Sequence, residues 1–316
     1  MPRRSLGGQP GEGWMMFRGW IAGTGAALAT QAAAMLLLGS PVSVVAADEE
    51  SGVGVVAEYR PASARFSFTR APRGEAVPVR IGTVVMAGDR VALPAGATLV
   101  IQLASGRTSK LEGPKTHTIA NTGPLGKVKA FFADISGVFD DEFRQEALAG
   151  SRGGEQCAAE GEAVKAIEVP ILVPDARIVA GNRDLPLAWR GGCAPFVVTV
   201  LAGGQALLDR ESIEGRQVRL DDVPLAPGRY SVVITDADGR RFEGALEATG
   251  EGPALPAELA ADTSSLGVVA QAVWLAEHER GRWRLESFER LRPLIRSGDP
   301  LAGSIGDGVL WGASPR

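Results

Sequence analysis

Residues 77–103 read VPVRIGTVVMAGDRVALPAGATLVIQL, and this stretch decides the fold of the first half of the chain. Short apolar runs alternate with polar residues, and glycine or proline separates one run from the next. Alternation over about four to eight residues predicts a strand with one buried face, and close, even spacing of such strands predicts a small all-β roll or barrel. The same pattern extends over about residues 55–120.

Glycine and aspartate mark the turns between these runs. Glycine tolerates a positive φ angle that other residues avoid, and aspartate accepts hydrogen bonds from its own downstream backbone. We therefore expect Gly88 and Asp89 to form a turn. Asp89 is accordingly interpreted as a turn residue rather than as a catalytic acid.

Four segments of this region place turn and strand residues in a recurring order. They are Arg80-Ile81-Gly82, Ala87-Gly88-Asp89-Arg90-Val91, Leu99–Leu103 followed by Ser105-Gly106, and Leu111-Glu112-Gly113-Pro114. Together they resemble a FecR-type domain over about residues 70–122. The resemblance implies a compact extracytoplasmic β module tied to signalling or envelope assembly. Its turn residues in this chain are Gly82, Gly88, Asp89, Gly106, Gly113 and Pro114.

The resemblance does not bring the regulatory role of the family with it. The iron-uptake regulators of that family place a cytoplasmic anti-sigma segment before a membrane span. Here about 17 residues precede the first apolar stretch, which is too few for such a segment. We therefore expect the β module without the regulator activity.

The N-terminal segment has the pattern of a secretory signal peptide. Arginines precede an apolar stretch at residues 20–38, and small residues at 45–47 suit a signal peptidase. We predict a signal peptide over residues 1–47, cleavage after Ala47, and a mature chain that begins near Asp48 in the periplasm or elsewhere outside the cytoplasm. The alternative is an uncleaved membrane anchor, because the apolar stretch approaches the roughly 20 residues that span a bilayer.

Residues after the roll change from strand-like to helix-like patterning. Apolar side chains recur at three- and four-residue spacing between Leu125 and Phe143. This spacing predicts an amphipathic helix that covers the roll or, alternatively, binds a partner. We therefore place the first domain at residues 55–143. Residues 144–165 are small, polar and rich in glycine, which indicates a linker.

Residues 166–250 carry a second series of short strands, which predicts an immunoglobulin-like antiparallel β-sandwich. Trp189 is expected in its core. Residues 225–230 resemble the start of a late strand in immunoglobulin-like domains, where a tyrosine, here Tyr230, packs inward while its hydroxyl bonds the backbone. The expected strands are Ile167–Val173, Leu185–Trp189, Phe196–Leu201, Gln217–Leu220, Tyr230–Thr235 and Phe242–Glu247.

Residues 256–316 predict a helical tail. One helix is expected around 266–277 with Asp262 or Thr263 as its cap, a second from Trp283 to just before Pro293, and a short third one from Asp299-Pro300. The fold class is therefore mainly β. We expect a small FecR-like β roll plus an immunoglobulin-like antiparallel β-sandwich, with a C-terminal helical hairpin.

The chain contains two cysteines, Cys157 and Cys193. An exported chain with two cysteines favours one disulfide between them, which would join the linker to the start of the second domain. Two free buried thiols are the alternative.

The sequence contains no recognisable catalytic or metal-binding motif. His117 and His278 are the two histidines of the chain and lie far apart, whereas a zinc site needs about four ligands. Asp236-Ala237-Asp238-Gly239 predicts a hairpin turn rather than a calcium loop, and the acidic cluster at 140–142 is interpreted as a solvated helix end. We expect no catalytic residue, no cofactor and no metal.

Charge and composition restrict the partners. A formal net charge of −4 with scattered arginines gives no general attraction to nucleic acid. We predict a non-enzymatic exported interaction protein, an accessory or scaffold subunit that docks onto an envelope or sensor protein. A carbohydrate- or cell-wall-binding module and a carboxylate-dependent hydrolase are the alternatives. Contact with a membrane is expected only through the signal segment, if that segment stays uncleaved.

Overall fold

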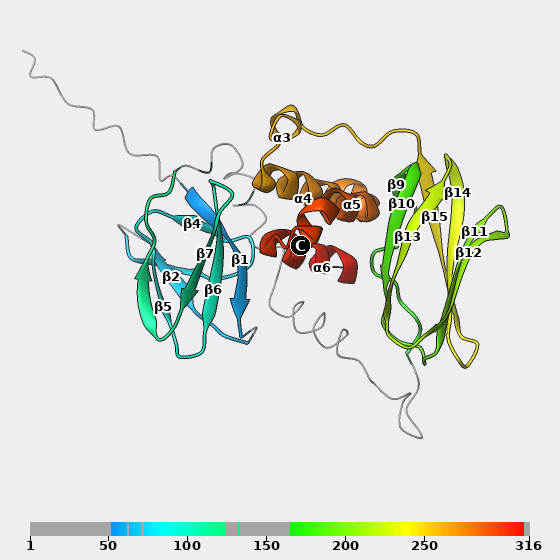
Figure 1. The fold of residues 1–316 in the computed structure, drawn as a ribbon, viewed down its shortest axis with the longest axis horizontal. Coiled ribbons are helices and arrows are strands. Elements are labelled where there is room, and N and C mark those ends of the chain that lie inside the picture. Colours follow the sequence, from blue (N-terminus) through cyan, green and yellow to red (C-terminus); the bar gives the residue numbers. More distant parts are fainter. Residues whose placement is uncertain are drawn as a thin grey trace, which may run out of the picture. The chain divides into compact units, whose positions relative to one another are not determined.

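The computed structural model describes residues 52–61, 63–70, 73–123, 125, 132 and 165–312 (Figure 1). The chain divides into two units, Met1–Ala46 and Ala47–Arg316, and all described residues belong to the second. The signal peptide with its cleavage at Ala47, most of the helix at 125–143, the linker and Cys157 lie outside the described residues. No described helix is both long and apolar enough to span a membrane.

The protein is mainly β. Its first described part is a roll of two four-stranded sheets, with strand orders β4-β1-β6-β7 and β3-β2-β5-β8, and every pairing in them is antiparallel. The strands are β1 Gly52–Arg60, β2 Ser67–Arg70, β3 Glu75–Pro78, β4 Val84–Met86, β5 Arg90–Leu93, β6 Thr98–Leu103, β7 Thr108–Glu112 and β8 Lys115–Thr118.

The central strand β1 begins before the expected start of the domain at residue 55. Its first six residues, GVGVVA, are buried on both faces, and β1 pairs with β4 on one side and β6 on the other. A strand buried on both faces has a continuous apolar run without alternation, so a search for period-two patterning misses it.

The second part is a β-sandwich with one five-stranded sheet, β12-β11-β14-β15-β9, and one two-stranded sheet, β10-β13 (Figure 1). The pairing is antiparallel apart from β9, which runs parallel to β15. The strands are β9 Ala176–Val179, β10 Gly181–Ala188, β11 Phe196–Ala202, β12 Gln205–Ile213, β13 Gln217–Leu225, β14 Gly228–Thr235 and β15 Arg241–Thr249.

The prediction of a strand over Ile167–Val173 is wrong. Residues 165–175 make one isolated bridge, between Glu168 and Arg190, and then turn into β9. Ile167, Val169 and Ile171 are nevertheless buried. The alternation of apolar residues in this segment therefore reflects the burial of their side chains and not pairing with a neighbouring strand.

The third part is helical and contains α3 Ala257–Ala260, α4 Ser265–Gly281, α5 Arg284–Arg296 and α6 Pro300–Trp311. The expected cap of α4 is wrong, because Ser264 is its N-cap and accepts a hydrogen bond from Gly267 N at 3.0 Å. The expected end of α5 before Pro293 is also wrong. The proline lies inside the helix, which continues for another turn because Leu294 and Ile295 pack against the core.

The start of α6 is as expected. Asp299 is its N-cap and accepts a hydrogen bond from Ala302 N at 2.9 Å, and Pro300 follows in the first turn. The tail is thus a set of three longer helices plus the single-turn α3, rather than a simple hairpin.

Candidate interaction site

The turn residues of the FecR-like pattern have conformational roles in the roll. Gly82, Gly88 and Gly106 all have positive φ angles, between 79° and 84°. Gly113 has no positive φ, but a Cβ atom there would lie 1.9 Å from Pro94 O, so close backbone approach requires the glycine. Pro114 follows it and is exposed.

Asp89 is fully buried and serves the turn, although not by the expected bond. Its Oδ2 accepts a hydrogen bond from the upstream Met86 N at 2.9 Å and lies 3.4 Å from Arg70 Nη2. The carboxylate therefore ties the turn between β4 and β5 to strand β2.

Trp189 and Tyr230 both lie in the sandwich interior. The Trp189 ring is fully buried and packs edge-on against Phe196, with ring centroids 5.1 Å apart. The Tyr230 hydroxyl donates a hydrogen bond to Ala226 O at 2.9 Å across the turn that begins β14. Both side chains are thus committed to packing and are not exposed for binding.

Neither His117 nor His278 belongs to a group of potential metal ligands among the described residues. His117 Nε2 lies 2.9 Å from Glu112 O, beside the turn between β7 and β8. The His278 ring is partly buried and stacks on Trp274, one helical turn earlier on α4, with centroids 4.2 Å apart.

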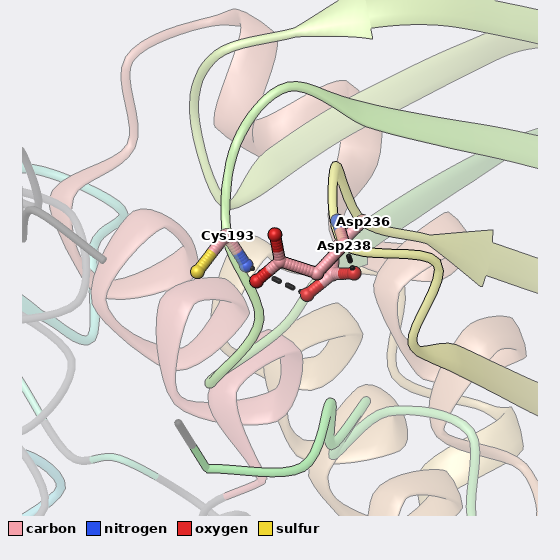
Figure 2. A group of neighbouring side chains, drawn as sticks. All are labelled: Cys193, Asp236 and Asp238. Carbon is pink, nitrogen blue, oxygen red and sulfur yellow. Dashed lines mark hydrogen bonds between the residues drawn. The ribbon is translucent and has the colours of Figure 1, made fainter. Parts of the chain in front are cut away.

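Cys193, Asp236 and Asp238 form the group that comes nearest to a metal site among the residues that the structure describes (Figure 2). One potential ligand atom from each lies within 4.8 Å of the others. Cys193, however, is disulfide-bonded and has no thiolate to offer. Cys157 lies outside the described residues, so the Cys157–Cys193 pairing stays a prediction.

A guanidinium already occupies the place of a cation in this group. Arg240 Nη1 lies 3.1 Å from Asp236 Oδ2, 2.6 Å from Asp238 Oδ2 and 3.8 Å from Cys193 Sγ. The Asp236 carboxylate also accepts backbone N–H bonds from Cys193, Asp238 and Arg240, at 2.9, 3.0 and 2.8 Å. The group is therefore a clamp on the β14–β15 hairpin, in line with the turn expected there.

The clamp predicts how stability depends on pH. Burial alone would raise the pKa of Asp236, but the N–H bonds from Cys193 and Arg240 and the Arg240 guanidinium outweigh it and lower that pKa below its ordinary value. The stabilisation is therefore complete above the unfolded-state pKa and is lost as pH falls through the lower folded-state value. We expect Asp236→Asn to reduce the free energy of unfolding by about 1–3 kcal/mol at pH 7.

Urea unfolding of both proteins between pH 7 and pH 2 checks this expectation. The difference in the free energy of unfolding between wild type and Asp236→Asn should shrink as the wild-type carboxylate becomes protonated. A difference that stays constant between pH 7 and pH 2 would contradict the stabilising role given to the Asp236 carboxylate.

A buried ionic hub joins the sandwich to helix α5. Asp184, on β10, is 1 % exposed on its side chain, and its Oδ2 lies 3.0 Å from Arg292 Nη1 and 3.1 Å from Arg296 Nη2. Its Oδ1 accepts a hydrogen bond from Asp222 N at 3.2 Å, at a bulge of β13 where Asp222 has a φ of 51°. One carboxylate thus holds two strands and a helix together.

The charges in this hub explain the pKa shifts of its carboxyl groups. Burial opposes the charged form of Asp184, yet the Asp222 N–H bond and the Arg292 and Arg296 guanidinium groups lower its pKa. For Glu289, burial outweighs the neighbouring Arg292 and raises the pKa. The Asp184 carboxylate is therefore the better stabilised charge of the two.

Helix α5 and Arg282, which precedes it at the end of α4, close one edge of the five-stranded sheet. Glu286 Oε2 accepts a hydrogen bond from Val179 N at 3.0 Å, and Arg282 O accepts one from Arg177 N at 2.6 Å. Both donors belong to β9, whose other side pairs with β15. An unpaired strand edge is a site of unwanted pairing, and here the helical part covers it.

Toward the other edge of the sheet, at β11 and β12, apolar side chains are exposed. Val197 on β11 and Leu207 on β12 are 37 % and 38 % exposed, and they are the exposed large hydrophobic residues of the described chain. Val197 and Leu201 on β11 share the outer face of the sheet, because their strand neighbours Val198 and Val200 are buried inward. Val233 on β14 is on the same face but is itself buried. We call Val197, Leu201 and Leu207 the β11 face.

The edge strand β12 is itself poorly suited to pairing. Its register with β11 shifts twice, and Leu207 lies at one of the two irregularities. Bulges disrupt the ladder of hydrogen bonds that an added strand would need. Binding at this end is therefore expected through the face and not through the edge.

Comparisons with known proteins give structural likenesses only. No family model and no curated protein matches the chain. Among solved structures, the chain is similar to CopC from Methylosinus trichosporium OB3b, with 19 % identity and a TM-score of 0.21 over 29 % of this chain and 97 % of that one. It is also similar to the Sidekick-1 immunoglobulin domains 1–5, with 12 % identity and a TM-score of 0.23 over 63 % of this chain and 38 % of that one.

A third likeness is to a 1.5-MDa bacterial ice-binding adhesin, with 13 % identity and a TM-score of 0.17 over 63 % of this chain and 52 % of that one. The chain therefore spans about half or less of these last two proteins. At such low scores none of the likenesses carries an argument about function.

Proposed function

We propose that this chain is a non-enzymatic exported interaction protein, an accessory or scaffold subunit that docks onto an envelope or sensor protein through the β11 face. The single observation that carries this proposal is the exposure of Val197 and Leu207 on the paired strands β11 and β12. The FecR-like pattern of the roll supports an extracytoplasmic setting by resemblance.

The surroundings of the β11 face suit a protein partner. Protein interfaces combine an apolar centre with a polar rim. On β15, the next strand after β14, Arg241 and Glu243 pair at 2.9 Å and are about half exposed. They would form part of such a rim around the apolar residues of β11 and β12.

The alternative of a glycan-binding module finds less support. Sugar-binding surfaces present aromatic rings to the solvent, and no aromatic side chain of the described residues is exposed. Trp189, Trp283 and Trp311 are all buried.

The alternative of a carboxylate-dependent hydrolase finds less support as well. The buried carboxylates of the described chain, Asp89, Asp184, Asp236, Glu286 and Glu289, each accept a backbone N–H bond. A carboxylate held in this way fixes a turn or an edge and is not presented to a substrate.

The docking proposal predicts the effect of charging the β11 face. In the double variant Val197→Asp and Leu207→Asp, we expect crosslinked capture of the partner from the native envelope to fall at least about tenfold, since placing a charge against an apolar partner surface opposes desolvation. Folding should change by only about 1 kcal/mol per site, because both side chains are more than a third exposed although aspartate is a poor strand former.

The matched control is Gln217→Asp on β13, an exposed position on the other sheet, which should leave capture unchanged. Mass determination of the mature N-terminus on the same samples tests export, with a start near Asp48 expected. If the double variant captures the same proteins at the same yield as wild type, the docking surface is wrongly assigned.

A further inference from the structure

The roll carries a positive charge, although the chain as a whole is acidic. Residues 52–123 contain nine lysines and arginines and four aspartates and glutamates, which gives this part a net charge of +5, whereas the whole chain has a formal net charge of −4. Charge asymmetry between parts of one chain is typical of proteins that bind nucleic acid or membranes. Salt screens exposed charges over about 10 Å, so a partner at the roll responds to the local charge.

The sheet β3-β2-β5-β8 gathers part of this charge on its outer face. Val91 on β5 is buried inward, so its neighbour Arg90 points outward, since side chains alternate across a strand. Glu75, the one acidic residue of these four strands, alternates to the other side of β3 from Ala76. The remaining residues of the outer face are small or carry a hydroxyl group, and all are exposed: Ser67, Thr69, Pro78, Ala92, Thr116 and Thr118.

Two arginines lie opposite each other at one end of this face. The register of β2 with β3 continues beyond both strands, because Val79 N donates a hydrogen bond to Phe66 O at 3.0 Å. The next pair in this register is Arg65 and Arg80, and both line a hollow of about 420 Å³ together with Ser67. Like charges opposite each other on a sheet repel, and an anion between them offsets this repulsion. The hollow therefore suits an oxyanion that accepts bonds from the guanidinium groups and the serine hydroxyl.

The charges of this face are not used in pairing within the described part of the chain. Elsewhere on the roll, Arg60 pairs with Glu58 at 2.6 Å. By contrast, Arg80 and Arg90 form no ion pair with any described residue. We call the outer face of the sheet, with Arg65, Arg80 and Arg90, the arginine face.

The composition of the arginine face favours a membrane surface over other polyanions. Single-stranded nucleic acids and sugars stack on exposed aromatic rings, and no aromatic side chain of the described residues is exposed. The side chains between the arginines are short, so they leave the guanidinium groups accessible to a broad surface. Anionic phospholipids attract basic residues without the insertion of large apolar side chains, and the arginine face carries none.

We propose that the arginine face docks onto a membrane surface of anionic phospholipids. The phosphodiester of one lipid lies between Arg65 and Arg80 and accepts a hydrogen bond from the Ser67 hydroxyl, while Arg90 contacts neighbouring headgroups. The roll makes this contact, not the signal segment, so the contact goes beyond the docking onto a protein through the β11 face.

Sedimentation of the exported protein with vesicles tests the proposal. We expect binding to mixed vesicles of equal parts phosphatidylglycerol and phosphatidylcholine, and binding at least about tenfold weaker to vesicles of phosphatidylcholine alone. The double variant Arg80→Gln and Arg90→Gln should weaken binding to the mixed vesicles at least about tenfold, since each basic residue near an anionic surface contributes roughly fivefold. High salt should release the wild-type protein, because it screens the attraction.

The matched control is the double variant Arg219→Gln and Arg229→Gln on the sandwich. It removes the same charge from exposed positions and should bind like wild type. Circular dichroism checks that both double variants fold, and the release by high salt tests the wild type without any substitution.

Three results would overturn the proposal. They are equal binding to the two kinds of vesicle, wild-type binding by the Arg80 and Arg90 double variant, and binding of a polyglutamate peptide without binding of the mixed vesicles. The last result would mean that the arginine face serves an acidic protein segment instead. The double variant of the β11 face should bind the mixed vesicles normally, so the membrane contact and the docking proposal fail independently.

Discussion

Replacing Trp189 by alanine is expected to lower the free energy of unfolding by about 3–5 kcal/mol, because the change leaves a large cavity in a core that can collapse only partly. The ring is fully buried between the two sheets and packs edge-on against Phe196. Few other side chains in the sandwich fill as much space, since Trp189 is the largest of its fully buried residues.

Urea unfolding followed by circular dichroism measures this loss. Trp274→Ala serves as the comparison, because Trp274 is only partly buried on α4, where it stacks on His278 and packs at the edge of the core. A smaller loss, of about 1–3 kcal/mol, is expected there. Equal losses in the two variants would mean that Trp189 is not the centre of the sandwich core.

Replacing Asp184 by alanine is expected to destabilise the protein by about 3–5 kcal/mol and to release α5 from the sandwich. Removing one member of a buried ion pair leaves its partners buried without a counter-charge. Here Arg292 and Arg296 would lose their shared acceptor, and Asp222 N would lose its hydrogen bond at the bulge.

Hydrogen exchange distinguishes release of the helix from general unfolding. Once α5 departs, the amide of Val179 loses its acceptor Glu286 and should exchange faster than the amides of β14. Asp175→Asn is the matched control, since Asp175 pairs with Arg282 at the same distance of 3.0 Å but is 68 % exposed. That surface pair should contribute no more than about 1 kcal/mol. Unchanged exchange at Val179 in Asp184→Ala would contradict a role for the hub in docking.

Local patterns predicted those elements that a local cause determines. β11 and β15 alternate between buried and more exposed residues, so their positions follow from the sequence. The α6 start follows from a capping aspartate and a proline next to each other. β12 has almost no buried side chain, and β1 is buried on both faces, so neither shows an alternating pattern.

The ionic hub had no comparable local signal. Asp184 and Arg296 are 112 positions apart, and neither stands in a motif. Their meeting depends on how α5 packs on β10, which only the tertiary structure determines. The β11 face could not be predicted from the sequence either. An exposed valine on a strand is common, and it marks a surface only once its neighbours on the adjacent strands are known.

The bonds from α5 to β9 also set an order of events during synthesis. A chain made from its N-terminus completes every strand that the structure describes before residues 284–296 exist. Until Glu286 arrives, the N–H group of Val179 stays open to pairing with another nascent chain. A product that stops before α5 would therefore be a complete sandwich with an open edge, and its expected fate is aggregation.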